Sequence, residues 1–324
     1  MHSAEELQQL FNNELKKLSF SRQPNNLYDP FKYMLDLGGK RMRPVMLLMA
    51  CEMFGADGTK AISQAIALEL FHNFTLIHDD IMDRAPLRRG KPSVHQKYGS
   101  ATAILSGDAM LIYAYQYLIK TSFSPIEKLV SVFNDCAISI CEGQQMDMNF
   151  EKGDTVSVEQ YFEMIDLKTA TLLAASMRVG AMIGGASEQD AEHTEHFGKN
   201  LGVAFQLKDD WLDAFGEAGK TGKQRGGDII QNKKTFLLLE ALRRADDDTK
   251  TELNQYFMSS GNDPEKKVGR VLEIFNSLQL DLVTRQAIEE YFSKALLSLQ
   301  KIEVGQELKL PLKNLIEIMM QRDH

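Results

Sequence analysis

Cysteine, long apolar runs and signals for export are all scarce in this sequence. Its 324 residues include only three cysteines, Cys51, Cys136 and Cys141. So small and odd a set does not make a disulfide framework, and it predicts a reducing, cytoplasmic location. No stretch reaches the roughly 18 apolar residues that cross a bilayer. The polar N-terminal segment carries early glutamates and does not resemble a signal peptide.

Positive charge is also in short supply. The chain has 37 Lys and Arg residues against 45 Asp and Glu residues, a formal net charge of -8. Nucleic acids and anionic membranes attract a basic surface, so this balance argues against general binding to either. The shares of hydrophobic residues (44%) and charged residues (25%) are those of an ordinary globular protein.

Alternating runs of Val, Ile and Thr are missing, so β-strands have little support. Helical periodicity dominates instead. Between residues 61 and 80, apolar side chains recur every three or four positions: Ile62, Ile66, Leu70, Phe74 and Ile77. Several other segments are apolar around most of a helix, which is typical of buried helices. Turn-rich clusters are too short to link domains. We therefore predict a single all-α domain spanning residues 1–324, with about ten or more helices.

Two short acidic motifs have the same pattern, Asp-Asp-x-x-Asp. The first holds Asp79, Asp80 and Asp83, and the second holds Asp209, Asp210 and Asp213. On a helix, the first and third aspartates of each motif share a face. Carboxylates that close repel unless a cation lies among them, and oxygen ligands without His or Cys favour Mg²⁺. A solvated acidic face is the alternative, but both motifs end strongly apolar helices, where unpaired charge is costly. Bound Mg²⁺ would imply a phosphorylated ligand.

Two basic clusters are suited to phosphate. The segment "APLRRGKP" puts Arg88 and Arg89 in a loop just after the first acidic helix. The planar guanidinium forks of arginine match phosphate oxygens. The segment "LGGKRMRP" carries Lys40, Arg41 and Arg43 at a predicted helix N-terminus, which attracts anions. For Arg41, a solvated helix cap is the alternative.

A third basic cluster is the Gly-rich segment "GKTGKQRGGDIIQNKKT". Its cations are Lys220, Lys223, Arg225, Lys233 and Lys234. A helix precedes it rather than a strand, and Ala214 occupies the first Gly position of a Walker A loop, so it is not one. Flexible Gly and Lys beside an acidic metal site favour a closing lid. A metal site would bind one anionic group, the basic residues would bind another, and the interior is apolar. Together these features describe a lipid diphosphate as the ligand.

These motifs resemble a known family. "DDIMDRAPLRRG" is similar to the first aspartate-rich motif of the trans-isoprenyl diphosphate synthases, also called polyprenyl synthetases, and "FQLKDDWLD" to the second. "GGKRMRP", "ELFHNFTLIHDD", "CEGQQMDM", "LKTATLL" and "GKQRGGDIIQNKKT" resemble the other blocks of that family, in the same order. The resemblance spans roughly residues 37 to 235, and its type is that of the short-chain geranylgeranyl and farnesyl diphosphate synthases.

The resemblance implies a helical homodimer with a deep central apolar cavity in each subunit. Such enzymes join isopentenyl diphosphate to an allylic diphosphate (dimethylallyl, geranyl or farnesyl diphosphate) and release pyrophosphate. Mg²⁺ and basic side chains stabilise negative charge as the C–O bond breaks. The isopentenyl double bond then attacks the allylic cation, and the released pyrophosphate is a plausible proton acceptor.

Residue roles follow from the resemblance by position. The Mg²⁺ ligands would be Asp79, Asp83 and Asp209, supported by Asp80, Asp210 and Asp213. The allylic diphosphate would be bound by Arg88, Lys168, Lys223 and Lys233. Isopentenyl diphosphate would be held by Lys40, Arg43, His72 and Arg89. Thr169 and Gln206 would line the reaction centre. A satisfied core histidine is the alternative for His72, and an ordinary surface lysine for Lys168.

Product length would be set below the first acidic motif. In the family, the residues four and five before its first aspartate help to form the floor of the cavity, and here they are Thr75 and Phe74. A bulky Phe favours a C15 or C20 product. "DDIMD" lacks the two-residue insertion of bacterial farnesyl diphosphate synthases, which favours C20, geranylgeranyl diphosphate. Farnesyl diphosphate synthase is the runner-up.

Two further alternatives are a class I terpene cyclase and a catalytically inactive partner subunit. A cyclase typically has Ser or Thr where this chain has Asp213, although Glu217 occupies the final position of the cyclase motif. Inactive subunits usually lose one acidic motif, and both are intact here.

Overall fold

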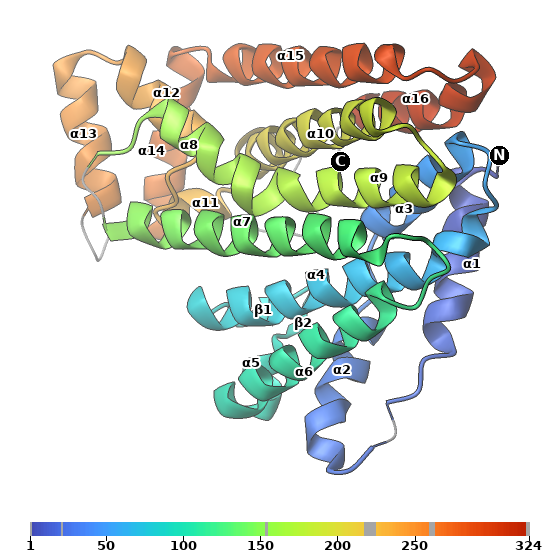
Figure 1. Cartoon of the computed structure of the whole chain (residues 1–324). Helices are drawn as coiled ribbons and strands as arrows, with labels where there is room; N and C mark the ends of the chain where they lie inside the picture. Colours follow the sequence, from blue (N-terminus) through green and yellow to red (C-terminus); the bar gives the residue numbers. More distant parts are fainter. Residues whose placement is uncertain (1, 21, 153–154, 217–224, 259–262, 322–324) are drawn as a thin grey trace. The chain divides into compact units, whose positions relative to one another are not determined.

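The structure, a computed structural model, describes residues 2–20, 22–152, 155–216, 225–258 and 263–321 (Figure 1). These residues are mainly helical, which confirms the all-α prediction. The first helices are α1 (Ala4–Lys16), α2 (Asn25–Asp36), α3 (Met42–Met53), α4 (Ile62–Met82), α5 (Val94–Tyr98), α6 (Ser100–Leu118), α7 (Ile126–Lys152) and α8 (Val158–Ile165). They are followed by α9 (Thr171–Gly184), α10 (Glu188–Phe215), α11 (Gly227–Ile230), α12 (Phe236–Arg244), α13 (Asp247–Met258), α14 (Pro264–Ser277), α15 (Leu280–Lys301) and α16 (Gln306–Gln321).

The described residues also form a 3-10 helix, a π-helix and a small sheet. A 3-10 helix, η1, covers Gly58–Ala61, and a π-helix, η2, covers Asp166–Ala170. Strands β1 (Leu87–Arg88) and β2 (Lys91–Pro92) form a two-stranded antiparallel sheet. No helix of the described residues is long and apolar enough to cross a membrane.

Contacts among the residues define two compact units, each built from segments far apart in sequence. Unit 1 comprises Met1–Asp135, Ala175–Glu195 and Lys301–Ile316. Unit 2 comprises Cys136–Ala174, His196–Gln300 and Glu317–His324. The single domain and the central cavity expected from the sequence stay predictions.

Unit 1 is organised around α3 and α4. Residues 45–51 of α3 are all buried, as its continuous apolar sequence requires. Burying a Leu or Met side chain contributes about 1.5–3 kcal/mol each, so this helix is a large part of the core. Helix α6 packs along α4. The approach is close at Gly107, where an added Cβ would lie 2.5 Å from Nε2 of His78.

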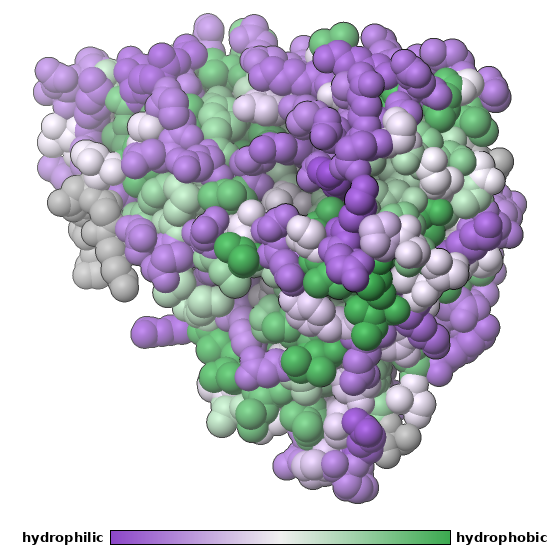
Figure 2. All heavy atoms as spheres, viewed as in Figure 1, coloured by the Kyte–Doolittle hydropathy of each residue, from purple (hydrophilic) through white to green (hydrophobic). Residues whose placement is uncertain are grey.

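The outer face of α6 is apolar and exposed. Leu105, Ile112 and Ile119 are 60%, 57% and 52% exposed, respectively. They are spaced by seven residues, or about two helical turns, so Leu105 and Ile112 lie on one side of α6, and Ile119, the C-cap residue, continues that side. Green, hydrophobic side chains appear in Figure 2 over the part of unit 1 where Figure 1 draws α6. The patch marks α6 as a candidate contact surface.

Unit 2 has its own core, in which Leu237, Leu238, Leu253 and Phe275 pack together. Helix α8 begins with a capping box: Ser157 Oγ accepts from the Gln160 N–H at 3.2 Å, and Gln160 Oε1 accepts from the Ser157 N–H at 2.9 Å. Helix α8 then continues directly into η2. The capping box therefore fixes the start of the helical segment that leads into the η2 residues, Asp166–Ala170.

Two glycines hold η2 tightly against its neighbours. A Cβ built on Gly143 of α7 would lie 2.4 Å from the Lys168 amide nitrogen, and one built on Gly202 of α10 would lie 2.6 Å from the Ala170 Cα. Real Cβ atoms do not approach backbone so closely, so only glycine permits this packing. A π-turn inside a longer helix is rare and often marks a functional site.

Candidate active site

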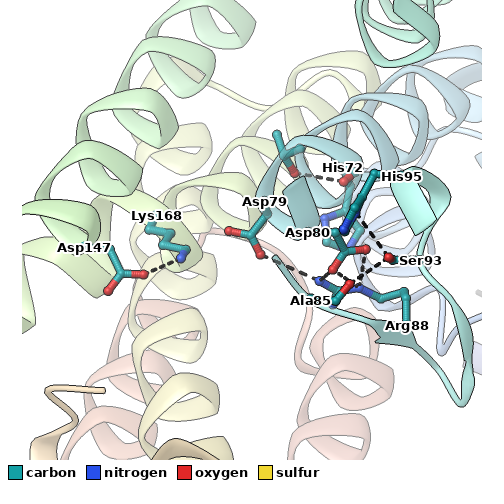
Figure 3. A network of polar contacts seen from close by, with 10 residues as sticks. His72, Asp79, Asp80, Ala85, Arg88, Ser93, His95, Asp147 and Lys168 are labelled. Carbon is teal, nitrogen blue, oxygen red and sulfur yellow. Dashed lines mark hydrogen bonds and ion pairs between the residues drawn. The ribbon is translucent and has the colours of Figure 1, made fainter. Parts of the chain in front are cut away.

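The first acidic motif lies at the end of α4 in unit 1. The Asp83 N–H donates to the Asp79 carbonyl at 2.8 Å, so the helical pattern reaches the last aspartate. Asp80 is 1% exposed and is locked by Arg88, whose Nη2 donates to Oδ1 at 2.6 Å and whose Nε donates at 3.1 Å (Figure 3). Arg88 Nη2 also lies 3.7 Å from Asp79 Oδ2. Burial raises the pKa of Asp80, and the Arg88 guanidinium opposes that rise.

Arg88 and Arg89 lie on a β-hairpin, not in the plain loop that the sequence led us to expect. Leu87 pairs with Pro92 and Arg88 with Lys91. The two residues of the turn, Arg89 and Gly90, have φ angles of 54° and 72°. Positive φ at both positions is the signature of a type I′ turn, whose twist matches that of a two-residue hairpin. The hairpin directs Arg88 back onto the end of α4.

The hairpin also reaches the basic segment before α3. The guanidinium Nη1 of Arg89 donates to the Gly38 carbonyl. A Cβ added to Gly39 would lie 2.9 Å from Arg89 Nη2. The next residue, Lys40, is exposed. Glycine at position 39 therefore leaves room for the Arg89 guanidinium.

Arg43 and His72 meet on the same unit, with Arg43 Nη1 3.3 Å from His72 Nε2. Burial lowers the pKa of His72 well below its ordinary value, and the positive charges around it act in the same direction; they belong to Arg43, Arg89, Arg88 and Arg41. The ring is therefore neutral at neutral pH. Three of the residues predicted for isopentenyl diphosphate, Arg43, His72 and Arg89, therefore lie near one another in unit 1, which also contains Lys40.

The idea that Arg41 is a solvated helix cap is wrong. Its side chain is buried, forms an ion pair with Glu69, and donates to the Leu35 carbonyl at 2.8 Å. Arg41 does precede the first turn of α3, in a left-handed conformation with φ 51°. Its guanidinium lies in the interior of unit 1, because the buried carboxylate of Glu69 requires a cationic partner.

The second acidic motif lies near the end of α10 in unit 2. Asp209 is exposed, whereas Asp210 is 4% exposed. Asp210 accepts from the Tyr161 hydroxyl at 2.6 Å and from Gln206 Nε2 at 2.9 Å. Thr169 in turn donates to Gln206 Oε1 at 3.1 Å. Burial, followed by the charge of Asp228, raises the pKa of Asp210 to about 7, against the opposing effect of its two hydrogen-bond donors.

The third aspartate of this motif holds the turn that leads into α11. The backbone N–H of Asp228 donates to Asp213 Oδ2 at 3.1 Å, and the Gly226 N–H donates to the Asp213 carbonyl at 2.8 Å. Lys233 is half-buried on the same unit, and its backbone N–H bonds to the Asp228 carbonyl. The predicted site residue Lys223 and the first part of the predicted lid, residues 219–224, lie outside the described residues.

Lys168 is positioned by an aspartate. It lies on η2, is half-buried, and donates from Nζ to Asp147 Oδ2 at 2.5 Å (Figure 3). Asp147 belongs to the "CEGQQMDM" block of α7. An ordinary solvated surface lysine would not form such an ion pair. It orients the Lys168 side chain on η2, where Thr169 is the next residue.

The two residues predicted to set product length, Phe74 and Thr75, are adjacent and lie about two turns before the end of α4. The Phe74 ring packs edge-to-face on His78, with 4.7 Å between ring centroids, and tilts against Phe71 at 5.7 Å. Its Cδ2 would lie 3.4 Å from a Cβ on Gly107, so Phe74 faces α6. Thr75 directs its hydroxyl to the His72 carbonyl at 2.8 Å.

The donor sets of both motifs fit a hard cation. Each offers carboxylate oxygens without His or Cys, which is the chemistry of Mg²⁺. Within the described residues, no three His, Cys, Asp or Glu side chains are grouped closely enough to hold a metal ion. The motifs belong to different units, so their joining in one metal site stays a prediction.

Three residues of these networks were missed from the sequence: Asp147, Tyr161 and Asp228. Asp147 could have been found, because it lies inside a block that resembles the family. Asp228 follows the Gly pair of the third basic cluster. Tyr161 carries no local signal at all, since only the packing of α8 against α10 brings its hydroxyl to Asp210.

Comparison with known proteins agrees with these motifs. The polyprenyl synthetase family model matches residues 24–275. The geranylgeranyl diphosphate synthase of Methanosarcina mazei is 42% identical over 68% of this chain and 69% of its own length. A crystal structure of a geranylgeranyl pyrophosphate synthase superposes with a TM-score of 0.94, at 43% identity and 99% coverage of both chains.

A more distant relative was crystallised with ligands. The geranylgeranyl pyrophosphate synthase of Corynebacterium glutamicum, complexed with isoprenyl diphosphate and magnesium, has a TM-score of 0.83 at 25% identity. It covers 98% of this chain and 97% of its own. The family model and the relatives both extend over well more than half of the sequence, and this chain belongs to the polyprenyl synthetase family of trans-isoprenyl diphosphate synthases.

Proposed function

We infer that this chain is a short-chain prenyltransferase that condenses isopentenyl diphosphate with allylic diphosphates to give geranylgeranyl diphosphate. The observation that carries this inference is the family match with both aspartate motifs and the Arg88–Arg89 pair intact. Two relatives that are 42% and 43% identical to this chain are named for the C20 product, which supports this product length.

The reaction needs a diphosphate leaving group held by cations. Mg²⁺, when bound by Asp79, Asp83 and Asp209, would supply charge stabilisation for the departing pyrophosphate. A relative crystallised with magnesium and isoprenyl diphosphate supports this choice of metal. Asp80, Asp210 and Asp213 would hold the motifs in place.

Basic side chains complete the binding of the two substrates. Arg88, Lys168, Lys223 and Lys233 would bind the allylic diphosphate, while Lys40, Arg43, His72 and Arg89 would bind isopentenyl diphosphate. Thr169 and Gln206 would line the reaction centre. Bond breaking leaves an allylic cation, and attack by the isopentenyl double bond forms the new C–C bond. The proton then lost would pass to the released pyrophosphate.

Product analysis separates this function from its alternatives. The protein is incubated with isopentenyl diphosphate and dimethylallyl, geranyl or farnesyl diphosphate, and the dephosphorylated products are separated by chromatography. A C20 product with all three primers is expected. A C15 end product indicates farnesyl diphosphate synthase, pyrophosphate release without isopentenyl diphosphate indicates a cyclase, and no reaction indicates an inactive subunit.

A homodimer and a cytoplasmic location belong to the same proposal. The exposed apolar face of α6, with Leu105, Ile112 and Ile119, supports a protein–protein contact. The mass in solution, measured by light scattering, tests the homodimer. The cytoplasmic location rests on the small cysteine count.

Replacing Arg89 by Asn is expected to raise the KM for isopentenyl diphosphate by about 10-fold or more. The change removes charge-assisted hydrogen bonds to a diphosphate. Asn is preferable to Ala because Arg89 has a positive φ, which Asn tolerates. Steady-state kinetics with the allylic substrate saturating gives the KM.

The matched control for Arg89 is Arg84→Asn. Arg84 is exposed and has a similar positive φ of 51°, so its replacement reproduces the loss of charge and the backbone preference. An equal KM in the wild type and in Arg89→Asn would move Arg89 out of the substrate site.

Replacing Phe74 by Ala is expected to lengthen the product by one or more C5 units. Removing the ring opens volume beside His78 and Gly107 that a longer tail can fill. Chromatography of the dephosphorylated products measures the shift. Phe20→Ala is the control, because Phe20 is also a half-buried ring of unit 1. An unchanged product in a folded, active Phe74→Ala enzyme would show that the floor lies elsewhere.

A further inference from the structure

We propose that Tyr161 is a positioning residue of the second acidic motif: its buried hydroxyl fixes Asp210 and thereby orients Asp209 toward the cation that it would bind. The inference rests on the proposed function, because it assigns Tyr161 a part in holding the catalytic metal. Tyr161 does not touch substrate or metal in this scheme, and it acts through Asp210.

The hydrogen bonds of Asp210 carry the argument. Each of its two carboxylate oxygens accepts from a different side chain, Oδ2 from Tyr161 at 2.6 Å and Oδ1 from Gln206 at 2.9 Å. Asp210 is 4% exposed and Tyr161 is 2% exposed, so the bond between them is shielded from water. Asp210 is thus committed to the protein interior.

The fixed orientation of the Asp210 side chain determines in which direction the neighbouring side chains of α10 point. Adjacent residues of a helix are rotated by about 100°, so fixing the Asp210 side chain inward also fixes the direction of the preceding side chain, Asp209. Asp209 is exposed, as expected if its carboxylate provides the metal-facing oxygens, whereas Asp213 is half-buried. A loose Asp210 would let this end of α10 present its charges in several arrangements.

Tyr161 is itself rigidly held. It lies on α8 directly after the Ser157–Gln160 capping box, and its ring packs against Phe162 and Phe236 at centroid distances of 5.9 and 6.3 Å. The same segment continues into η2, whose Thr169 donates to Gln206. One stretch of chain therefore reaches both oxygens of Asp210, directly through Tyr161 and indirectly through Thr169.

The chemistry of the anchor suits a metal site. In the first motif the buried aspartate, Asp80, is held by a charged residue, Arg88, which cancels one negative charge. In the second motif the donors are a phenol and an amide, and neither carries charge. Neither donor therefore adds a positive charge that would offset the negative charge of the motif.

Tyr161→Phe is the direct test because it removes the hydroxyl and keeps the ring. We expect magnesium to bind about 10-fold more weakly in the presence of inorganic pyrophosphate, the range for loss of a group that orients a metal ligand. Isothermal titration calorimetry measures this binding independently of turnover. The Mg²⁺ concentration for half-maximal condensation should rise by a similar factor.

A double-mutant cycle tests whether Tyr161 acts through Asp210. Magnesium and pyrophosphate binding is compared for Tyr161→Phe, Asp210→Asn and the double variant. If the two residues form one unit, the double variant binds within about 2-fold of Asp210→Asn alone, because the hydroxyl has nothing left to position. Tyr115→Phe is the matched control, since it removes a phenol bond of 2.6 Å to Asn134 in unit 1 and should bind as the wild type does.

The outcomes separate this inference from the proposed function. A wild-type protein that makes no prenyl product overturns the function. An active wild type with unchanged magnesium binding in Tyr161→Phe, or with effects that multiply in the double variant, overturns the positioning role alone. If Asp210→Asn does not fold by circular dichroism, the comparison of Tyr161→Phe with Tyr115→Phe decides.

Discussion

Chelation of divalent cations is expected to abolish condensation, and added Mg²⁺ is expected to restore it. The enzyme is treated with excess chelator and assayed for product from isopentenyl and allylic diphosphates, before and after Mg²⁺ is returned. The proposed substrates are polyanions, and the acidic motifs add further negative charge. Without a cation, the aspartates would repel the diphosphate that they are proposed to hold.

The size of this effect follows from the chemistry. A metal ion contributes several kcal/mol of charge stabilisation to a phosphoryl leaving group, and each 1.36 kcal/mol is about a factor of ten in rate. The basic residues cannot replace it alone, because Arg88 already bonds to Asp80 and Lys168 to Asp147. Chelator saturated with Mg²⁺ is the control for inhibition by the chelator itself. Sustained condensation in metal-free buffer would contradict the proposed mechanism.

The helical fold was predictable because its signal is local. Apolar residues at helical spacing indicate α4 from sequence alone, and the structure has that helix from Ile62 to Met82. The burial of Asp80 is harder to predict. An aspartate triplet at i, i+1 and i+4 places at least one carboxylate away from the other two, and the structure shows that this one is buried and paired with Arg88.

The hairpin that carries Arg88 and Arg89 was missed because its turn lacks the usual sequence signal. Type I′ turns are recognised by Asn-Gly or Asp-Gly, whereas here Arg89 precedes Gly90. Arg41 was misjudged for a different reason. Its partner Glu69 is 28 positions away in the sequence and lies on another helix, so nothing near Arg41 reveals that the side chain is buried.

The networks of unit 2 lie beyond local patterns for the same reason. Tyr161 reaches Asp210 across 49 residues, and Lys168 reaches Asp147 across 21. The π-turn that presents Lys168 and Thr169 also depends on tertiary contacts, through Gly143 and Gly202. A sequence motif can therefore name the reacting residues of such a site more easily than the residues that hold them.

Replacing Asp79 or Asp209 by Ala is expected to lower turnover by about three orders of magnitude or more while the fold survives. Each change removes a proposed ligand of the catalytic metal, and with it transition-state stabilisation worth several kcal/mol. Turnover is measured at saturating substrates over a range of Mg²⁺ concentrations, and thermal unfolding is followed in parallel. Asp135→Ala is the control, because Asp135 is an exposed helical aspartate outside both motifs.

Thermal stability distinguishes a metal ligand from a structural aspartate. Asp209 is exposed and adjoins buried Asp210, whose pKa its charge helps to raise. Removing that charge relieves repulsion, so the melting temperature of metal-free Asp209→Ala should stay the same or rise. Asp79→Ala also loses a 3.7 Å ion pair with Arg88, which is long enough that little stability should go with it. A melting temperature that falls while activity stays within a few-fold of the wild type would mean that these aspartates stabilise their helices and do not bind the metal.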